Sequence, residues 1–258
     1  MLKNVLLAMV VLITGTQESF GALLLTGIGV SATQNFNSLT TAATDISVLN
    51  TNGWRFATGA SPTFASGTLL ADRASSTTGA FTAGGTYNFG GTGVDRGLGA
   101  MTSGSFASPN HLIVELQNQT GVSITQLNFA FDWERYRINS SAASGTFFSS
   151  SDGSAWTAVA AGDSGSYSTG TSTYGINNSS IDSISRTGSI TGLSIDAGQN
   201  HYLRWTFNTT GSNSQAIGLD NFSITAVPEP TSIALVSLMC CTGFVAAFRR
   251  RIAKSKIA

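Results

Sequence analysis

The sequence predicts an all-β domain, a single sandwich or barrel of short strands, between two apolar terminal segments. Three observations indicate this fold class. Short runs alternate apolar and polar residues, turn residues such as glycine and asparagine separate the runs, and no long stretch repeats apolar residues with a helical period. The predicted strands are, in chain order, Ala22–Val30, Gly97–Thr102, His111–Gln117, Ser123–Arg135, Gly145–Ser150, Trp156–Val159, Gly188–Ile195, His201–Phe207 and Ala216–Thr225.

The first apolar segment, residues 1–21, has the pattern of a secretory signal peptide. Lys3 supplies a short basic start, Val5–Ile13 supplies the apolar core, and Ser19–Gly21 supplies a small-x-small cleavage site. We therefore expect the chain that follows to be exported.

Residues 22–226 form the expected body of the protein, and their number suits one β domain. Two stretches rich in glycine, serine and threonine, Gly59–Gly93 and Asp163–Asn178, are expected to be irregular loops. No fixed repeat period is visible, which argues against a solenoid. We expect a single sandwich whose strands are joined by loops of unequal length.

Alternation within two of the predicted strands indicates the buried face. Every second residue is a large apolar one, and each such side chain contributes about 2 kcal/mol when it is fully buried. The residues expected in the core are Leu127, Phe129, Phe131 and Trp133 in one strand, and Leu203, Trp205 and Phe207 in another.

The composition of the body excludes two classes of chemistry. Residues 22–226 contain no lysine, seven arginines and eleven acidic residues, a net charge of −4, so there is no basic stripe for nucleic acid. Both cysteines, Cys240 and Cys241, lie in the apolar tail. The body therefore has neither a disulfide nor a cysteine nucleophile or metal ligand.

The C-terminal segment predicts a membrane-spanning helix. Thr231–Phe248 carries no charge over eighteen residues, and as a helix it would be about 27 Å long, which just spans a hydrocarbon core. The basic tail 249–258 begins with Arg249, Arg250 and Arg251, which favour the cytoplasmic side. An ordinary membrane anchor is one interpretation of this segment.

A second interpretation comes from a family resemblance. Val227, Pro228, Glu229 and Pro230, followed by the apolar segment and the arginines, resemble the PEP-CTERM sorting signal of Gram-negative bacteria. The resemblance covers residues 227–258 only. The same tail is also labelled ice-binding protein C-terminal domain, a name that concerns the tail and does not imply ice binding.

The resemblance implies a route of export and a partner. An exosortase-type membrane protease would recognise and process residues 227–230, so that the helix anchors the protein in the inner membrane only transiently. The protein would then reach the cell surface or the extracellular matrix of a host that makes exopolysaccharide. If the tail is never cut, the protein is instead a permanently membrane-anchored surface protein.

Several short segments of the body resemble exported jelly-roll-like sandwiches, a group without a general assigned activity. The segments are Asp95–Met101, Val114–Asn118, Phe131–Arg137, Ser194–Gly198, Leu203–Trp205 and Gly218–Ile224, and Ser151–Trp156 resembles a hairpin of discoidin-like modules. This resemblance implies a single jelly-roll-like β-sandwich between the signal peptide and the sorting helix.

Four aromatic residues are candidates for binding a glycan. An exposed ring provides a stacking platform for a sugar, and Trp54, Trp133, Tyr136 and Trp156 are the candidate platforms. Trp54 follows Asn52-Gly53 and is the one most expected on a loop. Packing in the core is the competing interpretation for each of the four.

An extracellular hydrolase is the alternative function. Ser164 lies in a Gly-Asp-Ser-Gly sequence similar to the nucleophile loop of serine proteases, but a triad needs a histidine base, and the chain offers His111 and His201 alone. For a glycosidase pair, the candidate carboxylates are Asp132, Glu134 and Glu115. We expect that the protein is not an enzyme, and a charged surface is the competing interpretation of these carboxylates.

Metal binding has one weak signal. Asp220 and Asn221 are candidate ligands for a structural calcium ion, although no dense acidic loop of the EF-hand type is present. Two histidines without an acidic cluster nearby do not predict zinc. The expected protein is thus an exported cell-envelope or matrix protein, structural or polysaccharide-associated, without a required cofactor.

Overall fold

The computed structural model describes residues 21–39, 49, 53–65, 67, 73–74, 83–90, 95–106, 109–175 and 180–228. The predicted signal peptide up to residue 20 and the predicted helix 231–248 lie outside the described residues, as do Glu229, Pro230, Arg249, Arg250 and Arg251. In the described part of the chain, no helix combines the length and the apolar character needed to cross a membrane.

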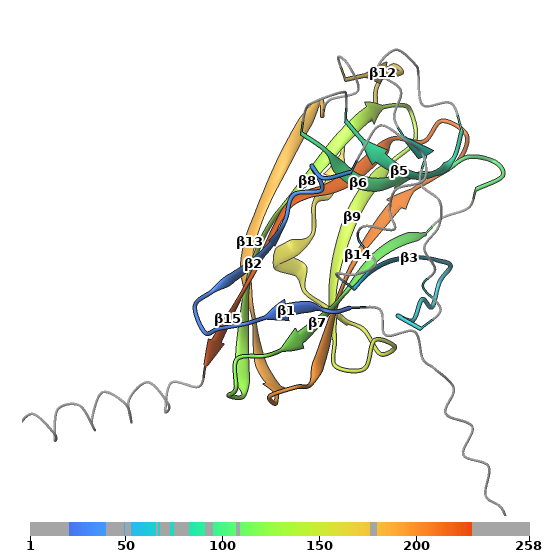
Figure 1. The fold of residues 1–258 in the computed structure, drawn as a ribbon. Helices are drawn as coiled ribbons and strands as arrows, with labels where there is room; N and C mark the ends of the chain where they lie inside the picture. The colour runs from blue at the N-terminus through green and yellow to red at the C-terminus, as the bar shows by residue number, and fades with distance from the viewer. Residues whose placement is uncertain are drawn as a thin grey trace, which may run out of the picture.

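The first of two β-sheets has the strand order β1, β7, β14, β9, β10, with β3 also paired to β7 and β11 to β9 (Figure 1). All its pairs are antiparallel except β1 with β7. Its strands are β1 (Leu23–Leu25), β3 (Trp54–Thr58), β7 (Asn110–Asn118), β9 (Ala143–Ser150), β10 (Thr157–Ala158), β11 (Gly165–Tyr167) and β14 (Asn200–Thr209).

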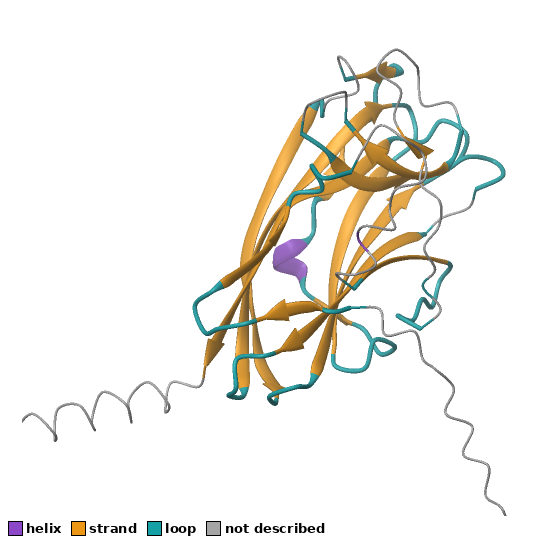
Figure 2. Ribbon diagram, in the orientation of Figure 1, coloured by secondary structure: helices purple, strands orange, loops and turns teal. Residues whose placement is uncertain are grey.

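The second sheet has the order β12, β8, β15, β6, β5, β4, with β13 also paired to β8 and β2 to β15. A 3₁₀ turn, η1 (Ala160–Gly162), lies between strands and is the purple segment of Figure 2. The strands are β2 (Ser31–Gln34), β4 (Arg73–Ala74), β5 (Gly85–Phe89), β6 (Gly97–Met101), β8 (Ile124–Ile138), β12 (Thr173–Tyr174), β13 (Asp182–Ile195) and β15 (Ala216–Pro228).

The two sheets pack face to face on an aromatic core. Trp205 of β14 lies 5.5 Å from Phe131 of β8 and 5.2 Å from Phe222 of β15, measured between ring centroids. Trp133 of β8 likewise meets Phe207 of β14 at 5.8 Å. Rings from both sheets thus interlock at right angles, an arrangement that aromatic quadrupoles favour. The predicted all-β sandwich is confirmed, and the jelly-roll comparison stays a prediction.

The alternation in the two core strands is confirmed. All seven residues expected in the core are buried there. Arg204, between two of them in β14, is also buried, because its guanidinium lies 4.0 Å from the ring centroid of Phe148 and 4.7 Å from that of Trp156. Both faces of β14 are therefore covered.

A smaller apolar cluster forms apart from the main core. Tyr136 of β8 stacks on Phe89 of β5 with ring centroids 4.3 Å apart, and Tyr87 stacks on Phe89 at 5.2 Å. Met101 and Ala216 complete the cluster. Because Tyr136 has the opposite strand parity to Trp133, this cluster covers part of the outer face of the second sheet.

Several expected boundaries were wrong. The stretch predicted as one strand, Ala22–Val30, is only β1 followed by a turn, and the loop expected over Gly59–Gly93 contains the fully buried β5. Trp54, expected on a loop, begins β3. The loop expected over Asp163–Asn178 contains the short strands β11 and β12. The missed strands form through pairing that local composition does not reveal: β3 with β7, β5 with β6, β11 with β9 and β12 with β8.

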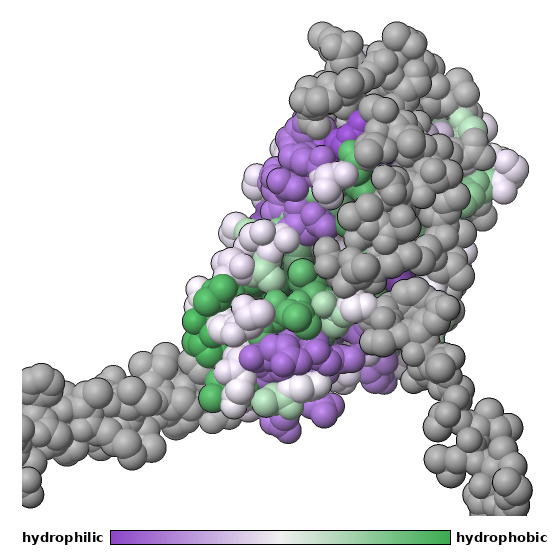
Figure 3. Space-filling model, in the orientation of Figure 1, coloured by the Kyte–Doolittle hydropathy of each residue, from purple (hydrophilic) through white to green (hydrophobic). Residues whose placement is uncertain are grey.

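The end of β15 lies beside the turn that joins β1 to β2. Gly29 N donates a hydrogen bond of 3.0 Å to Ala226 O. The turn region exposes three large apolar side chains, Leu24, Ile28 and Val30, and Figure 3 shows apolar surface in this part of the molecule. The chain therefore leaves the sandwich through β15 at an apolar edge.

Candidate functional site

Three of the four candidate stacking platforms are in fact buried. Trp54 stacks on Trp205 at 5.6 Å between ring centroids, Trp133 donates a hydrogen bond of 2.7 Å from Nε1 to Gly162 O, and Tyr136 belongs to the smaller cluster with Phe89. A buried ring cannot stack on a sugar from solvent. The interpretation of Trp54, Trp133 and Tyr136 as glycan platforms was therefore wrong, and the core interpretation holds.

Trp156 is half-buried and is already engaged. Its Nε1 donates a hydrogen bond of 2.7 Å to Pro62 O, and its ring lies against the guanidinium of Arg204. Of the four candidates it alone keeps a partly accessible ring. Its main contacts nonetheless fix the loop containing Pro62 against the outer face of the first sheet.

The serine-protease arrangement is not assembled. Ser164 is buried, with Oγ accepting a hydrogen bond of 2.6 Å from Gly145 N and donating one of 2.7 Å to Gly165 O. His111 bonds to Thr206 Oγ1 and to Gly59 O, and His201 bonds to Ser149 Oγ. Within the described chain neither histidine contacts Ser164, which has a structural role at the β9–β11 pair.

Of the three carboxylates considered for glycoside hydrolysis, Glu115 lies apart from the other two. Glu115 is in β7 of the first sheet, where Oε1 accepts hydrogen bonds from Asn200 Nδ2 at 2.6 Å and from the Tyr202 hydroxyl at 3.0 Å. Asp132 and Glu134 are in β8 of the second sheet. Asp132 accepts a hydrogen bond of 2.9 Å from Asn221 Nδ2, and its charge raises the pKa of Glu134 two residues along the strand. Glu134 is buried and belongs to a compact group of three acids.

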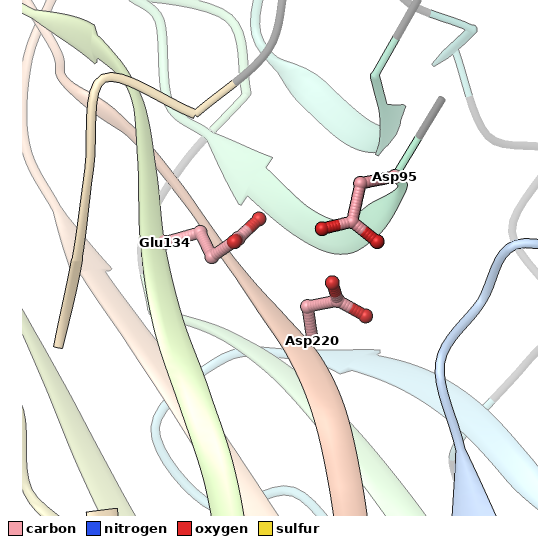
Figure 4. Close-up of side chains that lie close together, drawn as sticks. All are labelled: Asp95, Glu134 and Asp220. Carbon is pink, nitrogen blue, oxygen red and sulfur yellow. The ribbon is translucent and has the colours of Figure 1, made fainter. Parts of the chain in front are cut away.

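That group is a cluster of three carboxylates, Asp95, Glu134 and Asp220 (Figure 4). One oxygen from each lies within 4.8 Å of the others. Asp95 lies two residues before the start of β6, Glu134 is in β8 and Asp220 is in β15. Glu134 pairs with Gly218, two residues before Asp220, so the two acids are diagonal neighbours on one face of adjacent strands.

Burial shapes the electrostatics of the cluster. Asp220 is completely buried, and burial raises its pKa to about 8, with the charges of Glu134 and Asp95 acting in the same direction. Burial also raises the pKa of Glu134, although the Tyr136 hydroxyl donates a hydrogen bond to Glu134 Oε2. Asp95 is exposed, and its Oδ1 accepts a hydrogen bond of 3.2 Å from Asn37 Nδ2.

Of the two candidate calcium ligands, the structure places only Asp220 in this cluster. Asn221 lies at a register shift of β15 with φ of 51°, is exposed, and directs its amide to Asp132. Sequence reasoning missed Asp95 entirely and treated Glu134 as a surface or catalytic acid. The one local signal was an aspartate, Asp220, inside a strongly apolar strand.

A separate open groove runs along one flank of the sandwich, between β10 of the first sheet and β13 of the second. Its volume is about 700 Å³. Apolar side chains form its floor, among them the buried Ile190 and Ile195 and the half-buried Val159. Hydroxyl side chains make up much of the remaining lining, namely Ser149, Ser150, Ser151, Thr157, Ser189, Thr191 and Ser194.

The groove is electrically neutral. No acidic residue, lysine or arginine is among the described residues that line it. His201 reaches it from β14, with Nε2 bonded to Ser149 Oγ at 2.7 Å, and burial lowers the pKa of this histidine to about 4. At neutral pH the imidazole is therefore uncharged, and the groove presents hydroxyls above an apolar floor.

The first two residues of the predicted sorting motif belong to the fold. Val227 pairs with Gln126 and Pro228 with Ile124, at the end of β15. The motif thus starts inside a paired strand. Its processing by a protease stays a prediction.

No protein-family model and no curated protein matches the chain. Solved structures do match, at low similarity. The xylan-binding module CBM15 aligns at 11% identity and a TM-score of 0.39, covering 78% of this chain and 99% of that module. The CBM22-1 xylan-binding domain of Xyn10C from Paenibacillus barcinonensis aligns at 12% identity and a TM-score of 0.36, covering 80% of this chain and 99% of that domain.

A third similar structure is the K1 cleaved adhesin domain of Lys-gingipain from Porphyromonas gingivalis W83. It aligns at 15% identity and a TM-score of 0.38, covering 77% of this chain and 99% of that domain. All three are distant likenesses, and the proposals below depend on the residues of this chain.

Proposed function

We propose that the protein is an exported cell-envelope or extracellular-matrix protein whose body binds an uncharged polysaccharide in the groove between β10 and β13. The observation that carries this proposal is the lining of the groove, hydroxyl side chains around an apolar floor with no charged group. Its volume of about 700 Å³ lies within the range of small-molecule sites.

Sugar chemistry fits this lining. Each hydroxyl of a sugar both donates and accepts hydrogen bonds, as do the serine and threonine side chains that line the groove. The C–H face of a pyranose ring is apolar and suits the floor around Val159 and Ile190. Because no tryptophan or tyrosine is among the described lining residues, we expect modest affinity for a single sugar and retention by a long chain with many repeats.

We assign no reaction to this groove. His201 is its sole titratable lining residue in the described chain, and it is bonded to Ser149 with no carboxylate beside it. A general acid and base pair is therefore missing from the lining. The role proposed for the groove is binding alone.

Retention on neutral polysaccharide tests the proposal. Thr191 is exposed in β13 and lines the groove, so Thr191→Arg adds bulk and charge there. The full chain is run in detergent by affinity electrophoresis in gels containing neutral polysaccharide from the host. We expect the variant to be retained about tenfold more weakly, which corresponds to a loss of about 1.4 kcal/mol of binding free energy.

Thr187→Arg is the matched control, because Thr187 is exposed on the same strand and lies outside the groove. It should be retained like the unmodified protein. Equal retention of both variants, or no retention of the unmodified protein, would contradict binding in the groove.

Sorting through the C-terminal signal is the second part of the proposal. Its support is the order of segments in the sequence, Val227 to Pro230, then an uncharged run, then Arg249 to Arg251. The exosortase-type protease would cut near the motif and release the body to the surface or matrix. The inner-membrane anchor would then be transient.

Replacing Pro228, Glu229 and Pro230 with alanine tests this route in the native host. The variant should stay in the membrane fraction at full mass, while the unmodified protein is released without its tail, as intact mass would show. Pro109→Ala, a proline change within the body, should not alter release. Unchanged release of the triple variant would refute processing at this site, and retention of the unmodified protein would favour a permanent anchor.

A further inference from the structure

We propose that Asp95, Glu134 and Asp220 bind one calcium ion at the outer face of the second sheet. The site involves β6, β8 and β15 and lies on other strands than the groove, so it is independent of polysaccharide binding. Its three oxygens lie within 4.8 Å of one another and converge from separate elements (Figure 4).

The second observation is the state of Asp220. Its side chain is completely buried, and neither Oδ1 nor Oδ2 accepts a hydrogen bond of ordinary geometry, although the backbone N–H of Asn221 lies close enough to favour the ionised carboxylate. Buried polar atoms in folded proteins almost always have a partner, because desolvation without one costs free energy. A buried carboxylate without a partner of ordinary geometry, with one oxygen beside those of two other carboxylates, therefore indicates a ligand that supplies positive charge.

The surroundings do not neutralise the cluster. Within the described chain none of the three acids forms an ion pair, and the ion pair found there joins Arg135 to Asp182. The donors to the cluster are neutral groups: the Tyr136 and Ser180 hydroxyls beside Glu134, the Asn37 amide on Asp95 and the backbone N–H of Asn221 beside Asp220. Like charges this close cannot all stay ionised without a counterion, so the cluster holds either protons or a cation.

Geometry and ligand type favour calcium. Carboxylate oxygens are hard donors, which suit calcium and magnesium rather than zinc or copper. Two oxygens bound about 2.4 Å from a calcium ion are separated by at most about 4.8 Å, whereas the limit for magnesium is about 4.2 Å. The three oxygens lie within 4.8 Å of one another, so one calcium ion can reach all of them. Calcium also accepts irregular geometry, whereas magnesium demands a near-ideal octahedron and keeps several of its waters, so calcium is the ion proposed.

The position of Asp95 completes the site. Glu134 and Asp220 are buried, but Asp95 is exposed and leaves the cluster open to solvent on one side. Water ligands can enter there, as calcium requires six to eight oxygens. The bound ion would hold the start of β6 against β8 and β15, and through Asn37 it would also hold the loop after β2.

Thermal unfolding of the full chain in detergent tests the site. After removal of metal with EDTA, calcium should raise the Tm by about 5 to 10 °C at a free concentration of about one hundred times its Kd. Magnesium at the same concentration should give a clearly smaller shift. Terbium should also bind, and its luminescence should be sensitised by Tyr136, which is bonded to Glu134. Added calcium should displace the terbium and remove this luminescence.

Asp220→Asn should remove the shift in Tm caused by calcium. If this substitution at a buried position prevents folding, Asp95→Asn takes its place, because Asp95 is exposed. Asp196→Asn is the matched control, an exposed aspartate in the turn before β14, and should keep the full shift. The proposal is overturned if calcium leaves the Tm of the unmodified protein unchanged, if Asp95→Asn keeps the full shift, or if magnesium equals calcium.

Discussion

Gly145 and Trp133 illustrate how one absent side chain shapes the interior. The ring of Trp133 lies over Gly145, where a Cβ atom would be 2.5 Å from Cη2 and Cζ3 of the indole. The same indole donates its Nε1 hydrogen to Gly162 O. Glycine at position 145 therefore allows β8 and β9 to share one layer of the core.

Gly145→Ala should destabilise the fold by about 1 to 3 kcal/mol, because the indole must shift from both the glycine and its hydrogen bond. Urea unfolding followed by tryptophan fluorescence measures the change. Gly104→Ala is the control, since a Cβ there meets no atom within 4 Å, and it should change stability by less than about 0.5 kcal/mol. Equal effects would contradict the packing described for Trp133.

Single residues also show where sequence reasoning reached its limit. The parity of β8 placed Trp133 on the inner face, but it also implied that Glu134 and Tyr136 face solvent. They are buried because β5 and β6 cover that part of the outer face, with Phe89 stacked on Tyr136. Alternation assigns a side chain to a face, and it does not tell whether that face is covered.

At the scale of elements, prediction worked best for the central strands. β8, β14 and β15 carry regular alternation and are flanked by turn residues, so each was expected near its observed bounds. β3 and β5 were missed because their neighbouring residues resemble loops. β5 forms through pairing with β6, as Gly85–Phe89 matches Gly97–Met101 in antiparallel register.

At the scale of the whole molecule, composition and alternation were enough for the fold class and insufficient for the two sites. The groove joins β10 to β13, which belong to different sheets. The carboxylate cluster joins Asp95, Glu134 and Asp220 across more than a hundred residues of chain. Neither site has a local sequence pattern, because strand pairing and sheet packing create both.

The pH dependence of stability follows from two opposing sets of buried groups. Asp220 faces Glu134 and Asp95, and its pKa rises from 3.8 to about 8, so its contribution to stability is present at low pH and is lost as the pH rises toward 8. Burial lowers the pKa of His111 and His201 from 6.5 to about 4, so their contribution is present above pH 6.5 and lost below it. Between pH 6.5 and 8 the pH dependence of the free energy of unfolding therefore comes mainly from the buried carboxylates.

In EDTA, the free energy of unfolding should therefore fall by about 1 to 2 kcal/mol between pH 6.5 and 8. The negative charge of Asp132 also raises the pKa of Asp220. Tyr136 stays protonated across this window, because burial raises its pKa. Urea unfolding at several pH values measures the fall, and Asp220→Asn should flatten it. Stability that rises across this window would contradict the burial of a carboxylate.

The last described strand also determines how the body resists a pull. β15 is paired with β8 on one side, as far as Pro228, and with β6 and β2 on the other side, as far as Thr225. A tether at that end pulls along the strand axis, so both ladders are loaded together in shear instead of opening one bond at a time. If the tail is held in a membrane, as proposed, flow or drag on the body would act on a strand that is paired on both sides.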